Sequence, residues 1–489
     1  MALSGVVEET DSAAATQGGT RHYVALVVVG FALLQALWIV TVPPFRGVDE
    51  FDHAYRAAGV AHGQWRATEW ADNGRGILVA VPEELVEAAH DQCASLDYTG
   101  PDNCSPAGRA GDLVLVGSGA GGYNPAYYAV VGVLAGPFDG VTSLYIMRVV
   151  TALLCLLMVG MAAWSVAIRS RSRWSRAGLV FAVTPVMLYS TAIVAPNGVE
   201  LCAALCFWSA LLSLDGSATL QQERRLLWVA AGSASVLMVD RMLGPLFALS
   251  ILLTVWLLNP SLVRRVVTVH RRVFVLASVV VLASATYAVT WFLLSGAGSP
   301  EPGNHQGGGF VWTHPILWIF QSIAAFPTRS DPGAMVVYPI VLLIFVLLVS
   351  VALARATPRA RRVLILTMVV SVAIPLLLTA ATYAGRGSMW QGRYGLPYAM
   401  GVVLIGALLL DRSGLETRLR GAVLTLASVA MGIGTAACLV KLVTDESVRD
   451  VSRLDPGWLQ PAPAVLVTGT AAAWTLLRLG MGTGARATH

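Results

Sequence analysis

Apolar residues in this chain are grouped into long stretches, separated by shorter segments rich in arginine, glycine and proline. Most stretches contain about 16–24 residues, which as a helix cross a hydrocarbon core of about 30 Å. The pattern therefore predicts transmembrane helices. Twelve spans are expected, at 23–42, 143–168, 177–194, 198–214, 226–239, 243–258, 273–295, 335–354, 363–382, 396–410, 421–441 and 462–479.

The composition agrees with a membrane protein. Of the 489 residues, 56% are hydrophobic and 12% charged, and the mean hydropathy is +0.67. These values exclude an ordinary soluble globular protein. The sequence predicts an all-α, polytopic helical bundle in a single domain, 23–480, between a disordered N-terminal segment, 1–22, and a short tail, 481–489. The first span lacks a small-residue cleavage site, which favours a retained anchor.

Arginine is concentrated in alternate connecting segments, and this sets the expected orientation. With a cytoplasmic N-terminus, every short cytoplasmic loop contains arginine, as the positive-inside rule requires. Both termini are then cytoplasmic, and the preference for arginine over lysine suggests a bacterial plasma membrane. The net charge of +5 reflects this topology and contact with anionic membrane lipids, so no nucleic-acid partner is predicted. The cytoplasmic arginines are Arg169, Arg171, Arg173, Arg176, Arg224, Arg225, Arg264, Arg265, Arg271, Arg272, Arg355, Arg359, Arg361, Arg362, Arg412, Arg418 and Arg420.

Two long segments lie outside the cell in this topology, a first outer loop at 43–142 and a second at 296–334. In the first, Pro82 followed by two glutamates predicts a helix to about residue 92. The apolar run at 125–137 predicts a helix that lies on the membrane interface.

Six cysteines are present, and two of them, Cys93 and Cys104, lie in the first outer loop. An oxidising exterior favours a disulfide between them. The alternative is two free thiols in a flexible loop. The other four cysteines fall within spans and are expected to be packing residues.

A dense group of acids lies directly after the first span. Residues 48–55 contain Asp49, Glu50 and Asp52 next to His53. Charged groups at a membrane surface are costly to hold unless they serve chemistry or bind a cation, and a carboxylate here can act as a general base toward a sugar hydroxyl. Two other interpretations stay open. One is a solvated loop start, and the other is a divalent-metal site, since these are suitable ligand types.

Three arginines are expected at the same outer ends of the spans: Arg241, Arg386 and Arg393. Guanidinium groups bind phosphate in bidentate fashion and stabilise the charge on a leaving phosphate. Acid on one side and guanidinium on the other therefore suit sugar transfer from a lipid-linked sugar phosphate. Arg393 beside Tyr394 also fits an interfacial anchor, and Arg241 also fits an ion pair with Asp240 or an interior carboxylate.

Two motifs resemble those of a known group of proteins. Residues 47–56, GVDEFDHAYR, are similar to a Pro-x-Asp-Glu-x-x-His-x-x-Arg stretch, and residues 391–397, QGRYGLP, to a Gln-Gly-Arg-Tyr-x-x-Pro stretch. Both are hallmarks of a GT-C-like family of bacterial membrane proteins, often actinobacterial. The long first outer loop also resembles the wider GT-C superfamily of membrane glycosyltransferases, which use polyprenyl-phosphate sugars as donors.

The chain departs from the family pattern at two positions. Val48 stands where a proline usually precedes the acidic pair, which affects the turn more than the chemistry. Asn197 stands where an aspartate often follows a proline at the start of the fourth span, so a second acid from that position is in doubt.

The resemblance implies a role for each motif residue. Asp49 becomes the candidate general base with Glu50 assisting, and Arg393 the ligand of the donor phosphate; spacing alone does not choose between the two acids. Further substrate-binding candidates are His53, Arg56, Arg241, Arg386 and Tyr394.

The implied reaction moves a sugar from a polyprenyl-phosphate carrier to an envelope glycan or glycolipid outside the cell. The resemblance implies no definite cofactor for this reaction, although it is compatible with a divalent metal ion. One alternative is a transporter or flippase of a lipid-linked glycan, which predicts broken spans and charges near mid-membrane. Another is a non-catalytic subunit of an envelope-assembly complex, which needs none of these charges.

Overall fold

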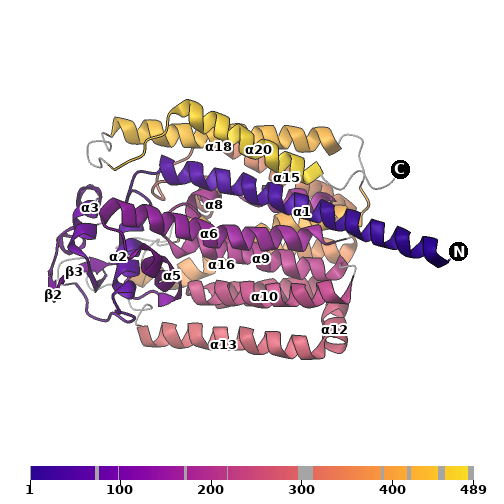
Figure 1. Cartoon of the computed structure of the whole chain (residues 1–489), viewed down its shortest axis with the longest axis horizontal. Helices are drawn as coiled ribbons and strands as arrows, with labels where there is room; N and C mark the ends of the chain where they lie inside the picture. The colour runs from indigo at the N-terminus through magenta and orange to yellow at the C-terminus, as the bar shows by residue number, and fades with distance from the viewer. Residues whose placement is uncertain are drawn as a thin grey trace.

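Long helices dominate the computed structural model and run side by side along its long axis (Figure 1). The structure describes residues 2–71, 76–96, 99–169, 173–216, 219–295, 312–386, 390–415, 420–449 and 457–482, and only the backbone of 2–17, 101, 216 and 384–386. Within these ranges, eight helices are long and apolar enough to cross a membrane. They are α1 (Ala2–Thr41), α6 (Gly140–Ala167), α13 (Arg271–Ser295), α15 (Val337–Arg355), α16 (Pro358–Arg386), α17 (Leu396–Arg412), α18 (Arg420–Val448) and α20 (Pro463–Gly482).

The polytopic helical fold is thus confirmed, with differences at the N-terminus and in the middle of the chain. α1 begins at Ala2 and so includes the N-terminal segment that the sequence predicts to be disordered. The expected span at 177–194 is divided into α7 (Arg173–Phe181) and α8 (Pro185–Ser190). The proline that begins α8 lacks the N–H needed to continue the preceding helix.

Three further helices occupy expected spans, but none of them alone is both long and apolar enough to count as a candidate membrane span. α9 (Pro196–Ser213) is buried along its whole length, and α10 (Leu220–Asp240) follows it. α11 (Gly244–Leu258) is followed, after a bend of 100°, by α12 (Pro260–Val269). Counting that bent pair as one span gives nine candidate spans among the described residues, so the number twelve stays a prediction.

The first outer loop is folded against the bundle. Its helices are α2 (Glu50–Ala61), α3 (Glu83–Ala94), α4 (Pro101–Cys104) and α5 (Pro125–Ala135). α3 confirms the helix predicted after Pro82, and α5 confirms the helix predicted from the apolar run. A side-chain oxygen of Asn124 accepts a hydrogen bond from the N–H of Ala126 and caps α5.

This loop also contains a small antiparallel sheet, which the sequence did not predict. β1 (Ile77–Val81), β2 (Gly108–Ala110) and β3 (Leu113–Ser118) pair in the order β1-β3-β2. In β1, buried positions alternate with half-buried ones, as a strand with one face on the core requires. The strands are so short that their period-two pattern is weak against the apolar spans around them.

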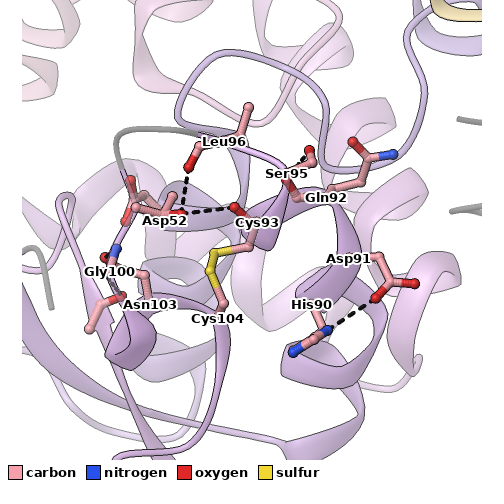
Figure 2. Close-up of a disulfide and its surroundings, with 12 residues drawn as sticks. Asp52, His90, Asp91, Gln92, Cys93, Ser95, Leu96, Gly100, Asn103 and Cys104 are labelled. Carbon is pink, nitrogen blue, oxygen red and sulfur yellow. Dashed lines mark hydrogen bonds and ion pairs between the residues drawn. A yellow bond between two sulfur atoms is a disulfide. The ribbon is translucent and has the colours of Figure 1, made fainter. Parts of the chain in front are cut away.

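The predicted disulfide between Cys93 and Cys104 is confirmed (Figure 2). It joins the end of α3 to α4, with the two Cα atoms 5.4 Å apart. The neighbouring Asn103 is buried, and its Nδ2 donates to the carbonyl of Gly117 in β3 at 2.8 Å. The disulfide therefore joins α3 to α4, and Asn103 connects α4 to the sheet.

Segments that the sequence predicts to lie outside the cell meet at one end of the bundle. Arg46 follows α1, and its Nε lies 3.0 Å from Oε2 of Glu446 near the end of α18. Arg449 contacts the same glutamate at 3.5 Å and Asp331 of the second outer loop at 3.7 Å. These ion pairs hold together three parts of the chain that are far apart in the sequence.

Segments predicted to be cytoplasmic meet at the opposite end. Both carboxylate oxygens of Asp411 in α17 accept backbone N–H groups at the start of α7, from Trp174 at 2.7 Å and Ser175 at 2.9 Å. Arg412 pairs with Asp215. Figure 1 places the strands at one end of the molecule and α12 with the N-terminus at the other. Which end faces the cytoplasm stays a prediction from the arginine pattern.

Candidate functional site

Asp49 lies at the turn between α1 and α2, where its backbone is left-handed, with φ 56° and ψ 18°. Aspartate tolerates this conformation better than most residues. Its side chain is partly exposed and makes no capping hydrogen bond to α2. The preceding N–H, of Val48, donates to the hydroxyl of Tyr189 at 2.9 Å. A proline at this position has no N–H to donate, so the departure to Val48 adds a bond that fixes the turn.

Glu50, the neighbour of Asp49, is fully buried in an ion pair with Arg148 of α6. Its two oxygens accept from Nε and Nη2 of Arg148 at 2.8 and 2.7 Å, and from the N–H groups of Gly47 and Val194 at 3.2 and 3.0 Å. Arg148 also donates to three carbonyls at the end of α1, those of Ile39, Val42 and Pro43. The structure therefore uses Glu50 to join α1, α2 and α6.

Asp52 and His53 are directed into the first outer loop. Oδ1 of Asp52 accepts the N–H of Gly119 at 2.6 Å, and its carbonyl accepts the hydroxyl of Ser118 at 2.8 Å. Nδ1 of His53 lies 2.8 Å from the hydroxyl of Tyr128 in α5. Both side chains thus connect α2 to other parts of the loop.

Arg56 is also buried and holds the loop from within. Its guanidinium group donates to the carbonyls of Gln64, Trp65 and Tyr123 at 3.0, 2.8 and 3.1 Å. Burial lowers the pKa of Arg56 to about 10, and the nearby Tyr128 opposes this shift. Arg56 therefore already has backbone partners where the sequence predicts contact with substrate.

The acids of α2 do not converge on one point. Within the described ranges, no group of three or more His, Cys, Asp or Glu side chains is arranged to hold a metal ion. Neighbouring residues on a helix project in different directions, and here Glu50 reaches α6, Asp52 the loop after β3, and His53 α5. The metal-site interpretation therefore has no support in the described part of the chain.

Two guanidinium groups flank the ring of Tyr394. The Cζ atoms of Arg241 and Arg393 lie 4.6 and 5.4 Å from its centroid, a cation–π arrangement. Nε of Arg241 lies 3.7 Å from Oε2 of Glu200, so the predicted pairing with an interior carboxylate is confirmed. Arg393 is 5% exposed, yet its Nε has no hydrogen-bond partner among the described residues. A buried guanidinium nitrogen without a partner is costly unless a ligand supplies one.

Gly392 lets the backbone before Arg393 approach α14 (His314–Ile323). A Cβ atom at this glycine would lie 2.1 Å from the carbonyl oxygen of Trp318. The N–H of Gly392 donates to Oε1 of Gln321 at 3.0 Å. The glycine of the second motif is therefore required by packing, and it determines where the following arginine lies.

Tyr189 in α8 connects the Asp49 turn to the arginines. Its hydroxyl accepts the N–H of Val48 and donates to the carbonyl of Pro327 at 2.8 Å. It also lies close enough to Arg393 for the charge of that arginine to act on it. Asp49 and Arg393 thus belong to one neighbourhood, although 344 positions separate them in the sequence.

Sequence reasoning gave no substrate-binding role to three buried polar residues near the same end of the bundle. Glu200 in α9 and Asp240 at the end of α10 are 2% and 8% exposed, and their charges lie close enough to interact. Oδ2 of Asp240 and Nδ2 of Asn197 have no hydrogen-bond partner among the described residues. The available signal was the position of Glu200 inside a predicted span and of Asn197 and Asp240 directly beside predicted spans.

The predicted substrate-binding residues therefore separate into two groups. Arg241 and Arg393 meet at Tyr394, whereas His53 and Arg56 are held within the first outer loop. Arg386 is the last residue of α16, and its side chain lies outside the described part of the chain.

Comparison with known proteins gives a family and similar solved structures. A family profile described as "Predicted membrane protein (DUF2142)" matches residues 31–402. No curated protein sequence matches the chain. The chain is similar to ArnT from Cupriavidus metallidurans bound to undecaprenyl phosphate, with 18% identity, 94% of this chain and 77% of that chain covered, and a TM-score of 0.44. The apo form of that ArnT gives 17% identity, the same coverage and a TM-score of 0.43. At this level of likeness, no residue of this chain takes a role from ArnT.

Proposed function

The chain belongs to the DUF2142 family of predicted membrane proteins, and we propose that it is a GT-C-like glycosyltransferase of the cell membrane. In this proposal, it moves a sugar from a polyprenyl-phosphate carrier to an envelope glycan or glycolipid. The reaction takes place at the end of the bundle that carries the first outer loop, on the outer side of the membrane.

The observation that carries the proposal is the open guanidinium nitrogen of Arg393 in the neighbourhood of a partly exposed acid, Asp49. Arg393 is buried, and Arg241 adds a second positive charge at the same tyrosine ring. Such a pair of fixed cations suits a phosphate that gains charge as it leaves. A lipid-linked phosphate fits a site at the end of a membrane bundle.

The chemistry assigned to these residues balances as a single displacement. Asp49 takes the proton of an acceptor hydroxyl as general base. The acceptor oxygen forms a bond to the anomeric carbon of the sugar, and the bond from that carbon to the phosphate oxygen breaks. The polyprenyl phosphate leaves with the electron pair, and Arg393 and Arg241 stabilise its charge.

The surroundings of the two neighbouring acids favour Asp49 over Glu50 as the base. Glu50 accepts four hydrogen bonds and neutralises the buried Arg148. Protonating it would leave that arginine without its counter-charge, which is strongly unfavourable in a buried site. Asp49 is partly exposed, so it can exchange its proton with water after each turnover.

Asp240 and Asn197 supply suitable partners for sugar hydroxyls. Their open atoms are one acceptor, Oδ2, and one donor, Nδ2, and both residues are more than nine-tenths buried. A hydroxyl can donate to the first kind and accept from the second. We assign them to the acceptor or to the transferred sugar.

A flippase of a lipid-linked glycan is the second candidate. The breaks between α7 and α8 and between α11 and α12 favour it, because discontinuous helices are common in transporters. Proteoliposomes that contain a fluorescent polyprenyl-phosphate sugar distinguish the two functions. A flippase moves the intact lipid between leaflets, whereas a transferase consumes it only when an acceptor is present.

Asp49→Asn tests the transferase directly. It should reduce transfer by about 100- to 10,000-fold, the usual contribution of a general base, while donor binding and membrane insertion persist. Asp112→Asn, in the exposed turn between β2 and β3, is the matched control and should leave transfer unchanged. Near-normal transfer by Asp49→Asn would refute this assignment, and Glu50→Gln with Arg148 intact would then be the variant to compare.

A further inference from the structure

At the end of the bundle opposite the first outer loop, three helix ends bring six arginines together. We call this group the basic corner: Arg224 and Arg225 in α10, Arg264 and Arg265 in α12, and Arg271 and Arg272 at the start of α13. α12 lies across the end of the bundle, and α13 returns along its edge (Figure 1). Glu223 of α10 pairs with Arg265 of α12 and with His270, which lies between α12 and α13, so the three helix ends are adjacent.

The sequence of α12 suits a helix lying in a membrane surface. Leu262 and Val266 face the protein and are buried, whereas Val263 and Val269 are 40% and 46% exposed. Arg264 is exposed as well. A short helix that presents valines and arginines to its surroundings fits the boundary between headgroups and acyl chains.

One carboxylate belongs to these segments, and it is already used inside the protein. Glu223 is 4% exposed and accepts hydrogen bonds from Arg265 and from Nε2 of His270, the latter at 2.7 Å. The residues 219–225 and 259–272 contain no other acid. The exposed side of the corner is therefore strongly positive.

A second group of arginines, 355–362, provides an internal comparison. The Nε atoms of Arg359, Arg361 and Arg362 donate to backbone carbonyls, those of Leu257, Leu353 and Pro358, at 2.9, 3.0 and 3.3 Å. In the basic corner, the side chains of the five arginines other than Arg265 form no hydrogen bond or ion pair with any residue that the structure describes. The protein therefore supplies hydrogen-bond acceptors for the second group of arginines, whereas five of the six arginine side chains in the basic corner have none among the described residues.

We infer that the basic corner is a binding site for the phosphodiester headgroup of an anionic phospholipid. The positive charge of the corner favours an anion, and the exposed apolar face of α13 favours a lipid over free phosphate. Directly after Arg271 and Arg272, the outward face of α13 exposes Val275, Leu276, Val279 and Leu282, by 51–65% of their surfaces. A headgroup on the arginines would have its acyl chains along this face. The inference is independent of the proposed catalytic activity.

The test uses the full chain in detergent with added phosphatidylglycerol or phosphatidylcholine, and counts retained lipids by native mass spectrometry. Wild type should retain phosphatidylglycerol selectively, and less of it as salt rises. Arg264→Gln/Arg271→Gln/Arg272→Gln should weaken that binding by about fivefold for each arginine removed. The corresponding triple lysine variant keeps the charge and should retain most of the binding.

Arg359→Gln/Arg361→Gln/Arg362→Gln is the matched control, because it removes the same charge from the same end of the bundle and should keep the selective retention. Equal phosphatidylglycerol retention by wild type and the corner variant would overturn the inference. Inorganic phosphate that displaces the lipid at equal concentration would also overturn it, since the acyl chains would then contribute nothing.

Discussion

At one end of the bundle, Glu50 and Arg148 are fully buried and satisfy each other, whereas at the other end the side chains of Arg264, Arg271 and Arg272 are exposed and have no partner among the described residues. The first end uses charge to fix the backbone, and Arg393 and Asp240 are among the charged residues there that keep one buried atom without a hydrogen-bond partner, as Arg56 does at its Nε. The second end uses charge on its surface. In a buried region, a polar atom without a hydrogen-bond partner therefore indicates a candidate ligand contact. On the surface, the indication is a group of exposed charges without ion-pair partners.

The largest effect that distinguishes the two ends is expected from Glu50→Gln. It leaves Arg148 buried without its counter-charge, and breaking such a pair typically costs about 3–5 kcal/mol. Thermal unfolding in detergent should show a clearly lowered midpoint, while Arg272→Gln should leave the midpoint unchanged. Glu50→Gln/Arg148→Met, which removes both charges, should recover part of the loss. Equal midpoints for Glu50→Gln and Arg272→Gln would contradict the contrast.

A smaller effect, measured here on donor binding, is expected at Arg393. Hydrogen bonds to charged groups contribute about 1.5–3 kcal/mol, so Arg393→Ala should weaken binding of a radiolabelled polyprenyl phosphate by about 10- to 100-fold. Arg393→Lys keeps the charge but loses the bidentate fork, so its affinity should lie between those of wild type and Arg393→Ala. Arg109→Ala, at an exposed ion pair of the first outer loop, is the control. If both Arg393 variants bind like wild type, the phosphate is held elsewhere, with Arg241 next to test.

Single introduced cysteines can show which end of the bundle faces the cytoplasm. They are placed where they should disturb the structure of neither end. The four free native cysteines are buried and the other two are disulfide-bonded, so they need no removal. Asp112→Cys should react with an impermeant thiol reagent in intact cells, and Ser261→Cys in α12 only after permeabilisation; both positions are exposed. The reverse pattern would place the candidate site in the cytoplasm and exclude the proposed donor geometry.

Sequence patterns predicted the features that depend on neighbouring residues. The apolar spans, the helix after Pro82 and the bridge between Cys93 and Cys104 follow from hydrophobicity, capping and compartment. The sheet was missed because β2 is three residues long and its pattern is short. The sequence also left Asp49 and Glu50 equivalent.

What separates the two acids is a contact with Arg148, 98 positions away, which no local pattern encodes. The same holds for the pairing of Arg241 with Glu200, where the sequence offered Asp240 or an unspecified interior carboxylate. Asn197 and Asp240 were visible as polar residues in or near apolar spans. Only the packing of α9 and α10 reveals that each keeps an open atom.

The turn after α1 has a consequence for the dynamics of the backbone. The N–H groups of Gly47, Val48 and Val194 belong to connecting segments, yet each donates to a buried side chain, Glu50 or Tyr189. Amide hydrogens in such bonds exchange with solvent only when the surrounding structure opens. These connecting segments should therefore exchange as slowly as the helices they join, and the segment that presents Asp49 behaves as part of the rigid bundle.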